Sequence, residues 1–271
     1  MSEPTPAPPP PPAPAAEPTA GPVPSRRGFL VAGAGAIAGA LGLRWIQTAE
    51  PEDGIPWPLR RMHEFNERVW RTLHRPGALA PTFPASAAVD MDVNGRVGLR
   101  TPLDAAAWRL TVESAADAGT VRRTLTFEDI AALPRTEMVT EFKCVEGWSA
   151  VVAWAGVTLA DLAAAYKLGT RSGGAPDLGR PVDLLAYVGL ETPDRQYYVG
   201  LEAEAAFHPQ TLLAYDMNGA RLTPDHGAPL RLVTPLKYGY KQIKRIGRLW
   251  FGDQRPADYW AGYGYDWHGG H

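Results

Sequence analysis

The chain of 271 residues has very little cysteine and almost no net charge, and each scarcity excludes a class of protein. Cys144 is the only cysteine, so no disulfide forms within the chain, and the Cys-X-X-Cys-His pattern of covalent haem attachment is missing. Lysine and arginine number 27 against 29 aspartate and glutamate, which argues against nucleic-acid binding through a phosphate-neutralising surface. The weakly hydrophobic stretch from Phe29 to Leu43 falls short of the ~20 apolar residues that span a bilayer comfortably.

The N-terminus divides into two segments. Residues 1–24 are rich in proline and alanine and bury no apolar surface, which predicts an extended, solvated tail. Residues 25–46, SRRGFLVAGAGAIAGALGLRWI, place Arg26 and Arg27 before a Gly/Ala stretch and are similar to a twin-arginine export signal, with Val31 where lysine is usual. The alternative is a short membrane-associated helix. No clear Ala-X-Ala site follows, so cleavage or retention as an N-terminal anchor stays open.

A twin-arginine signal predicts export, by the twin-arginine machinery, to the periplasm or the outer face of the cytoplasmic membrane. That machinery carries folded proteins, commonly because a cofactor is inserted in the cytoplasm. The segment therefore directs the search toward a cofactor, for which a lone cysteine is a natural ligand.

The rest of the chain has the pattern of one mixed α+β domain at 60–255, between a linker at 47–59 and a C-terminal tail at 256–271. Met62, Phe65, Val69 and Leu73 lie at helical spacing in 60–74. Thr126 and Thr158 begin capping patterns that predict two short helices. Strands are predicted within 108–114, 137–142, 182–191, 196–202, 212–222, 229–235 and 244–251, with an Asn-Gly turn at 218–219.

These elements place Cys144 on a loop after the predicted strand 137–142. Its simplest interpretation is an inert buried cysteine. It could also be the nucleophile of a hydrolase with His208 or His226 as its base. Alternatively, the thiol ligates a cofactor, or the chain is a binding module that holds no cofactor.

Two polar stretches accompany it. Residues 224–235, PDHGAPLRLVTP, hold His226 and Arg231, and residues 237–248, KYGYKQIKRIGR, hold five cations interleaved with tyrosine and isoleucine. Composition alone favours a solvated strand face. The functional alternative is an anion pocket in which backbone N–H groups and cationic donors converge on a phosphate.

Taken together, KCVEGWSAVVAWAGVTLADLA and LTPDHGAPLRLVTPLKYGYKQIKRI resemble the molybdopterin-dependent oxidoreductases of the sulfite oxidase fold. Within them, the sequence resembles the branch of bacterial periplasmic methionine sulfoxide reductase catalytic subunits. The resemblance runs from about Arg60 to Arg255. It implies the molybdopterin-binding fold without the C-terminal immunoglobulin-like dimerisation domain of sulfite oxidases.

The resemblance also implies roles for particular residues. Cys144 becomes the catalytic thiolate bound to molybdenum, a soft ligand for a metal held by the pterin dithiolene. The implied molybdenum–molybdopterin contacts come from one loop, two polar stretches and the first helix: Thr192, His226, Arg231, Gln242, Ile243, Lys244, His63, Asn66 and Glu67. His226 stands where the reductases have asparagine and sulfite oxidases have histidine. The three helix residues could equally form an ordinary polar face.

The implied activity is oxygen-atom transfer, with reduction of a sulfoxide such as protein methionine sulfoxide as the first hypothesis and sulfite oxidation as the alternative. Val-Glu-Gly-Trp after the cysteine differs from the Ala-Gly-Asn-Arg type of sulfite oxidases and favours the sulfoxide. Electrons then come from a separate partner, a membrane haem b subunit or a cytochrome, and the chain is a monomeric catalytic subunit. His268 and His271 in the final WHGGH lack further metal ligands, so we expect a frayed end there.

Overall fold

The computed structural model describes residues 26–52, 54–73, 77–117 and 119–271, and the chain divides into two compact units, Met1–Thr48 and Ala49–His271. The described part of the first unit is helix α1 (Arg26–Thr48), which covers nearly all of the expected signal segment. The tail expected at 1–24 lies outside the described residues. Among the helices that the structure describes, none is long and apolar enough to cross a membrane.

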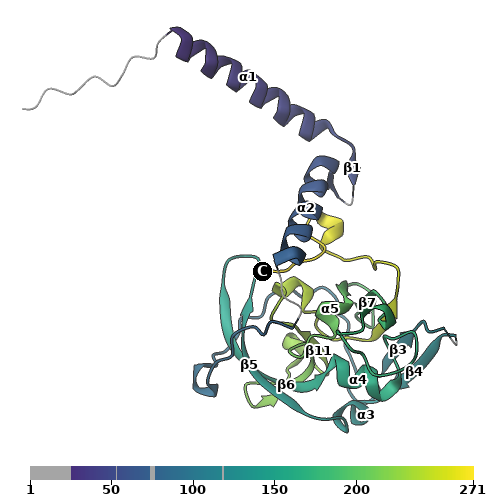
Figure 1. The fold of residues 1–271 in the computed structure, drawn as a ribbon. Helices are drawn as coiled ribbons and strands as arrows, with labels where there is room; N and C mark the ends of the chain where they lie inside the picture. The colour runs from purple at the N-terminus through teal and green to yellow at the C-terminus, as the bar shows by residue number, and fades with distance from the viewer. Residues whose placement is uncertain (1–25, 53, 74–76, 118) are drawn as a thin grey trace, which may run out of the picture. The chain divides into compact units, whose positions relative to one another are not determined.

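The second unit is a mixed α+β domain (Figure 1). Its α-helices are α2 (Trp57–Leu73), α3 (Phe127–Ala131), α4 (Leu159–Tyr166) and α5 (Ala203–Ala206). Short 3₁₀ helices are η1 (Ala85–Ala87), η2 (Pro181–Asp183), η3 (Pro224–His226), η4 (Gly239–Lys241) and η5 (Ala261–Tyr263). The predicted α+β class is confirmed.

Two larger sheets organise this unit in the described part of the chain. One has the order β10-β9-β6-β5 with β11 also paired to β9, and the other has the order β4-β3-β12-β7-β8. Their strands are β3 (Leu110–Ser114), β4 (Val121–Leu125), β5 (Thr136–Lys143), β6 (Ser149–Thr158), β7 (Tyr187–Glu191), β8 (Tyr198–Glu202), β9 (Leu212–Met217), β10 (Ala220–Arg221), β11 (Arg231–Val233) and β12 (Arg248–Gly252). A small pair, β1 (Pro51–Glu52) and β2 (Ile55–Pro56), precedes α2.

Local sequence signals explain several of these elements. Thr126 forms the predicted capping box with Asp129 at the start of α3, because each side chain bonds the other residue's backbone N–H. The Thr158 hydroxyl likewise accepts the N–H of Asp161 at the start of α4. The predicted Asn218-Gly219 turn joins β9 to β10. Such short-range signals place elements along the chain, and the packing of the sheets does the rest.

The core consists of two clusters of buried side chains. The larger fills the space around the β3–β12–β7 sheet, with Leu110, Leu190 and Leu249 fully buried. The smaller lies under β5, β6 and β9, and Phe142 and Trp154 belong to it. The loop between β5 and β6 packs against this smaller cluster, which is what positions the only cysteine.

The C-terminal residues differ from the expected tail and frayed end. Trp267 and His268 are buried, and residues 256–271 belong to the same compact unit as the sheets. The yellow C-terminal segment in Figure 1 runs beside α2, where Arg60 donates hydrogen bonds to the carbonyl oxygens of Ala261 and Tyr265. The tail was expected because the resemblance ends at about Arg255, yet the aromatic side chains of this segment supply apolar surface that packs against the domain.

Candidate active site

Cys144 lies in the loop that joins β5 to β6, as predicted. Its N–H donates to the carbonyl oxygen of Trp148 at 2.9 Å, and its own carbonyl oxygen accepts the N–H of Gly147 at 3.1 Å. The positive φ of Gly147, 92°, suits a residue without a Cβ at this tight turn. The turn holds the thiol at half-burial on the wall of a cavity.

This cavity has a volume of about 150 Å³. Polar groups, cations and aromatic rings from six segments of the chain share its wall: Met91, Asp92, Asn94, Gly95, Val97, Phe142, Cys144, Val145, Glu146, Trp148, Tyr197, Arg231, Gly239, Tyr240, Gln242, Lys244, Trp260 and Tyr265. The two polar stretches of the sequence therefore meet the cysteine loop in one place.

A carboxylate and an amide stand next to the thiol. The Asn94 Nδ2 atom lies 3.7 Å from Cys144 Sγ and 3.0 Å from Glu146 Oε2. The Trp148 indole N–H also faces Glu146, at 3.4 Å. This network fixes the direction of the exposed Glu146 carboxylate and places a negatively charged group near the thiol.

Arg231, on β11, is the cation that the cavity buries most deeply, with 1% of its surface exposed. Its Nη1 atom donates to the His226 carbonyl oxygen at 3.2 Å, and its guanidinium lies 4.8 Å from the Trp154 ring centre. Within the described residues, its Nε atom has no hydrogen-bond partner and no carboxylate lies within ion-pair distance. Burial lowers the pKa of this guanidinium, because nothing on the described chain compensates its charge.

Lys244 adds to this cationic end of the cavity, and His226 lies next to Arg231 without lining the cavity. Lys244 Nζ donates to the carbonyl oxygen of Asn94 at 2.7 Å, and burial, followed by the nearby Arg231, lowers its pKa to about 8. Burial and the same arginine lower the pKa of His226, whose Nδ1 atom has no partner among the described residues. Arg231 and Lys244 thus lie at the same cavity, and among the described residues no carboxylate is bonded to either of them.

The other residues implied by the resemblance lie at or behind this wall. Gln242 lines the cavity, and its Oε1 atom has no partner within the described chain. Ile243 is fully buried in the larger core cluster. The Thr192 hydroxyl bonds Asp194 and the N–H of Tyr197, so it supports a cavity residue from behind. Their contacts with a cofactor stay predictions.

The 237–248 stretch was predicted to form a solvated strand face or an anion pocket, and two of its lysines do neither. Lys237 pairs with Glu202 and contacts His268, and Lys241 donates to Asp258 at 2.6 Å. Both lysines are buried, so neither the solvated face nor the anion pocket describes them. Only Lys244, of the five cations in the stretch, lines the cavity.

The predicted helix residues are not brought to the cysteine. His63 and Glu67 line a second cavity with Arg255 and Asp258, and Glu67 forms ion pairs with Arg255 and Arg71. Asn66 is exposed on α2. Their predicted contact with the cofactor finds no support in this arrangement, which is that of a polar helix face.

Sequence reasoning missed much of the cavity wall, and three of the missed residues are Asn94, Trp260 and Tyr265. Asn94 lies in an irregular segment with no periodicity, and only the turn pattern Asn-Gly marked it. Trp260 and Tyr265 fell in the expected tail. The aromatic run Tyr-Trp-Ala-Gly-Tyr-Gly-Tyr was the available signal, since a true tail has little reason to carry so many rings.

The residues around Cys144 do not fit a hydrolase that uses a cysteine nucleophile and a histidine base. Neither His208 nor His226 lines the Cys144 cavity. His208 Nε2 lies 3.2 Å from the carbonyl oxygen of Ala78, and the N–H of Gln210 donates to its other ring nitrogen. A cysteine nucleophile needs a base within hydrogen-bond reach, and the cavity wall supplies none of histidine type.

Comparison with known proteins supports the resemblance that the sequence motifs indicate. Residues 98–260 match the family described as the oxidoreductase molybdopterin binding domain. A protein of Azospira oryzae, provisionally named protein-methionine-sulfoxide reductase subunit YedZ1, is 32% identical over 252 residues, which are 92% of this chain and 88% of that protein.

Two further relatives are protein-methionine-sulfoxide reductase catalytic subunits MsrP, from Campylobacter jejuni and Burkholderia mallei. Each is 35% identical, over 52% and 58% of this chain, and the chain spans only 48% and 47% of their lengths. Among solved structures, the sulfane dehydrogenase SoxCD from Paracoccus pantotrophus aligns with a TM-score of 0.48 and 22% identity, over 71% of this chain and 53% of that one.

Fold, cavity and relatives define an enzyme of the class of oxidoreductases that use a molybdenum–molybdopterin cofactor. The chain belongs to the oxidoreductase molybdopterin binding domain family.

The residues of the cavity fit this cofactor. A phosphate needs cationic donors, and the buried Nε atom of Arg231 and the ammonium of Lys244 have no carboxylate partner among the described residues. Molybdenum in this class takes a soft ligand, and Cys144 is the only thiol of the chain and lines the same cavity. The predicted cofactor is therefore consistent with both the donor set and the family.

Proposed function

We propose that this enzyme reduces a sulfoxide, with methionine sulfoxide in proteins as its substrate class. The carboxylate of Glu146, joined through Asn94 to the region of the Cys144 thiol, carries the proposal. This negative charge at the reaction centre would repel a sulfite dianion, whereas it would not repel a neutral sulfoxide. The names of the relatives, two of them sulfoxide reductase catalytic subunits, support the same substrate class.

When bound, the molybdenum cofactor supplies two-electron oxygen-atom transfer. Arg231 and Lys244 would hold its phosphate, and Cys144 would ligate its metal. Asn94 orients the Glu146 carboxylate through the hydrogen bond at 3.0 Å, which keeps anions away from the thiol. The Phe142 and Trp148 rings, stacked with centres 5.6 Å apart, share the cavity wall with the thiol.

The test is a substrate screen on the cofactor-loaded enzyme. Reduced viologen dye serves as electron donor for methionine sulfoxide peptides, and ferricyanide serves as acceptor for sulfite. We expect sulfoxide-dependent oxidation of the dye and no sulfite-dependent reduction of ferricyanide. Faster turnover of sulfite than of any sulfoxide would overturn the proposal.

Cys144→Ser is the matched control for this screen. We expect a folded protein without turnover, because an alcohol oxygen is a harder and less covalent donor than a thiolate. The half-buried position of Cys144 at a turn allows the substitution without a cavity in the core. Near wild-type turnover in this variant would remove the ligand assignment.

The relatives are named as subunits, and we propose that electrons reach this chain from a separate membrane haem b subunit or cytochrome. The absence of a Cys-X-X-Cys-His pattern from the sequence supports an external haem. Mixing the reduced partner with enzyme and a sulfoxide should reoxidise the haem. A reoxidation rate independent of the enzyme would contradict this proposal.

We also propose export by the twin-arginine route, on the strength of the Ser-Arg-Arg-Gly-Phe-Leu pattern. Replacing Arg26 and Arg27 together by lysine keeps the charge and removes the planar guanidinium pair that the export receptor reads. Active, molybdenum-loaded enzyme should then stay in the cytoplasm. Full export of the variant, or its accumulation without molybdenum, would contradict the link between the signal and cofactor loading.

A further inference from the structure

Aromatic rings line the part of the Cys144 cavity that the C-terminal segment, residues 256–271, helps to build. Tyr197, Tyr240, Trp260 and Tyr265 all line this cavity, and the last two come from the C-terminal segment. The Tyr265 ring centre lies 5.5 Å from that of Tyr240 and 4.9 Å from that of Trp260. We call Tyr240, Trp260 and Tyr265 the aromatic wall.

The hydroxyl groups of Tyr240, in the aromatic wall, and of Tyr197, beside it, donate to backbone carbonyl oxygens. Tyr197 donates to the carbonyl oxygen of Tyr240 at 2.5 Å, and Tyr240 donates to the carbonyl oxygen of Asp266 at 2.6 Å. Burial raises the pKa of both phenols, so they stay neutral and keep donating these bonds. With their polar ends satisfied by carbonyl oxygens, the two residues offer ring surface rather than charge to a ligand.

The segment that carries the wall is fixed from two sides. Lys241 Nζ donates to Asp258 Oδ2 and to the Trp267 carbonyl oxygen, both at 2.6 Å. Arg60, on α2, donates to the carbonyl oxygens of Ala261 at 3.0 Å and Tyr265 at 3.1 Å. These bonds bracket Trp260 and Tyr265 along the chain, so the wall exists before any ligand binds, as a selective surface requires.

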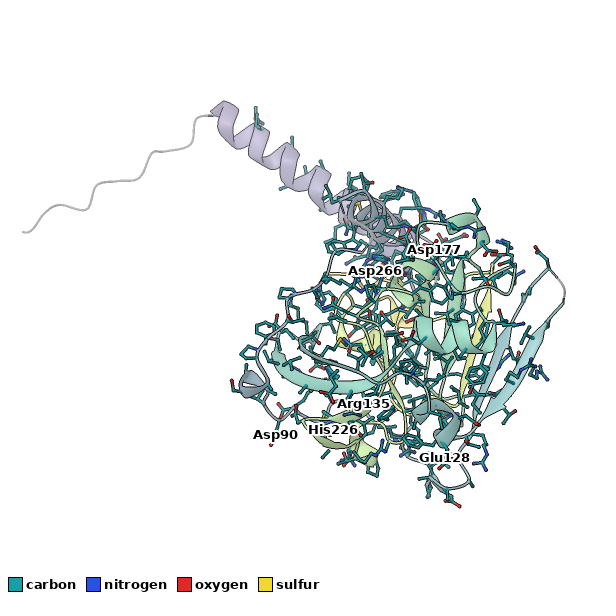
Figure 2. All side chains as sticks on the ribbon, turned by 60° about the horizontal axis from the view of Figure 1, so that its bottom comes forward. Asp90, Glu128, Arg135, Asp177, His226 and Asp266 are labelled. Carbon is teal, nitrogen blue, oxygen red and sulfur yellow. The ribbon has the colours of Figure 1, made fainter. Side chains whose placement is uncertain are left out.

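The wall and the cationic end of the cavity bond different parts of the backbone. Arg231 bonds the carbonyl oxygen of His226, whereas Tyr240 bonds that of Asp266. Figure 2 labels His226 and Asp266, and they lie well apart on the domain. The cationic end therefore suits the phosphate of the cofactor, and the aromatic wall is left for a different, apolar group.

We propose that Trp260 and Tyr265 determine specificity by receiving the apolar arm of the sulfoxide substrate, an inference that rests on the proposed function. A sulfoxide carries one polar S–O group and two alkyl arms, so the S–O group must face the reaction centre beside Cys144 while an arm needs an apolar surface. Aromatic rings suit this arm, because each ring offers a large apolar surface. A long arm, as in methionine sulfoxide within a peptide, gains from the wall, and a methyl group gains little.

The test compares two substrates on the cofactor-loaded enzyme, a methionine sulfoxide peptide and dimethyl sulfoxide. Trp260→Ala should raise the KM for the peptide roughly tenfold, since a half-buried indole contributes on the order of that factor to apolar binding. The kcat for the peptide and the KM for dimethyl sulfoxide should change less than about twofold, since neither depends on the long arm. Trp260→Phe should restore most of the peptide KM, because it restores an aromatic ring.

Tyr263→Ala is the matched control, an aromatic residue of the same segment that is 65% exposed and does not line the cavity. It should leave both KM values unchanged. Calorimetric titration with the methionine-containing product peptide provides a measurement without turnover, and Trp260→Ala should weaken this binding by the same factor as the KM.

Four results would overturn the inference. An equal rise of KM for both substrates would show that the ring does not contact the long arm. Loss of molybdenum from Trp260→Ala, with Tyr263→Ala fully loaded, would assign the wall to the cofactor. A wild-type enzyme that reduces no sulfoxide would remove the proposed function as well, whereas one that reduces both substrates without any arm-dependent effect of Trp260 would remove this inference alone.

Discussion

Two kinds of buried or half-buried cation lie within a short distance along the chain. Lys237 and Lys241 each contact a carboxylate, Glu202 and Asp258, and the Lys241–Asp258 pair is fully enclosed. Arg231 and Lys244 lie at the Cys144 cavity and bond only carbonyl oxygens among the described residues. The charges of Lys237 and Lys241 are compensated by carboxylates of the chain, whereas those of Arg231 and Lys244 would be compensated by a bound anion.

The pKa shifts follow this division. Burial acts to raise the pKa of Glu202, but Lys237 and His268 outweigh it and hold the value well below the usual range. Burial alone accounts for the lowered pKa of Arg231, and no carboxylate acts to raise it. A buried cation without a carboxylate is costly to keep in a fold, so its presence marks a ligand site more reliably than the number of basic residues does.

The largest effect on stability should come from the enclosed pair. Lys241→Ala leaves the Asp258 carboxylate buried without its partner, and we expect the unfolding free energy to fall by about 3–5 kcal/mol. Denaturant titration of the cofactor-free protein measures it. The double variant Lys241→Met with Asp258→Asn should recover part of this loss, since no uncompensated charge remains. A single-variant loss below about 1 kcal/mol would mean that the pair is not needed.

Arg231→Met should give the opposite pattern. It keeps the length of the side chain and removes a charge that lacks a carboxylate, so the unfolding free energy of the cofactor-free protein should stay equal or rise. Cofactor affinity should fall by about 2 kcal/mol or more, because a buried phosphate loses a charged donor. Molybdenum content after purification and denaturant titration measure the two quantities. Full molybdenum content in this variant would assign Arg231 a structural role.

A third prediction uses pH to separate the two kinds of cation. In the folded protein, burial lowers the pKa of Lys244 to about 8, from its ordinary value of 10.5. Between these two values the unfolded chain binds more protons, so the unfolding free energy of the cofactor-free protein should rise with pH across this window. Cofactor affinity should fall across the same window, because neutral Lys244 no longer attracts a phosphate.

Lys244→Met is the control for this pH dependence. Its unfolding free energy should vary less between pH 8 and pH 10.5, the range that Lys244 titrates in the wild type. Equal slopes in the two proteins would show that another group is responsible.

The fold was predictable where its signals are local. Thr126 and Asp129 are three residues apart, and the alternation in 137–142 needs only neighbours, so α3 and β5 followed from the sequence. The partners of Lys237 and Lys241 lie 35 and 17 residues away, and no local pattern distinguishes these lysines from Lys244. The role of each lysine depends on which carboxylate the fold brings next to it, and only the tertiary structure decides this.

The candidate site was predictable in part for the same reason. Cys144, Arg231, Gln242 and Lys244 belong to contiguous motifs, and the structure brings all four to one cavity. His63 and Glu67 were placed by a loose match on a helix and line another cavity. The aromatic wall comes from residues near the chain end, where burial is decided by contacts with Arg60 and Lys241 that leave no trace in local sequence.

The smallest effect should come from an ion pair that has good geometry but little burial. Arg171 and Asp253 form two parallel hydrogen bonds of 2.7 Å, and their side chains are 38% and 47% exposed. If geometry decided the energy, Arg171→Ala would approach Lys241→Ala in its effect. Because water screens exposed charges, we expect a much smaller loss than for Lys241→Ala in denaturant titration and unchanged molybdenum content. A loss as large as that of Lys241→Ala would show that bidentate geometry, rather than burial, distinguishes the ion pairs of this domain.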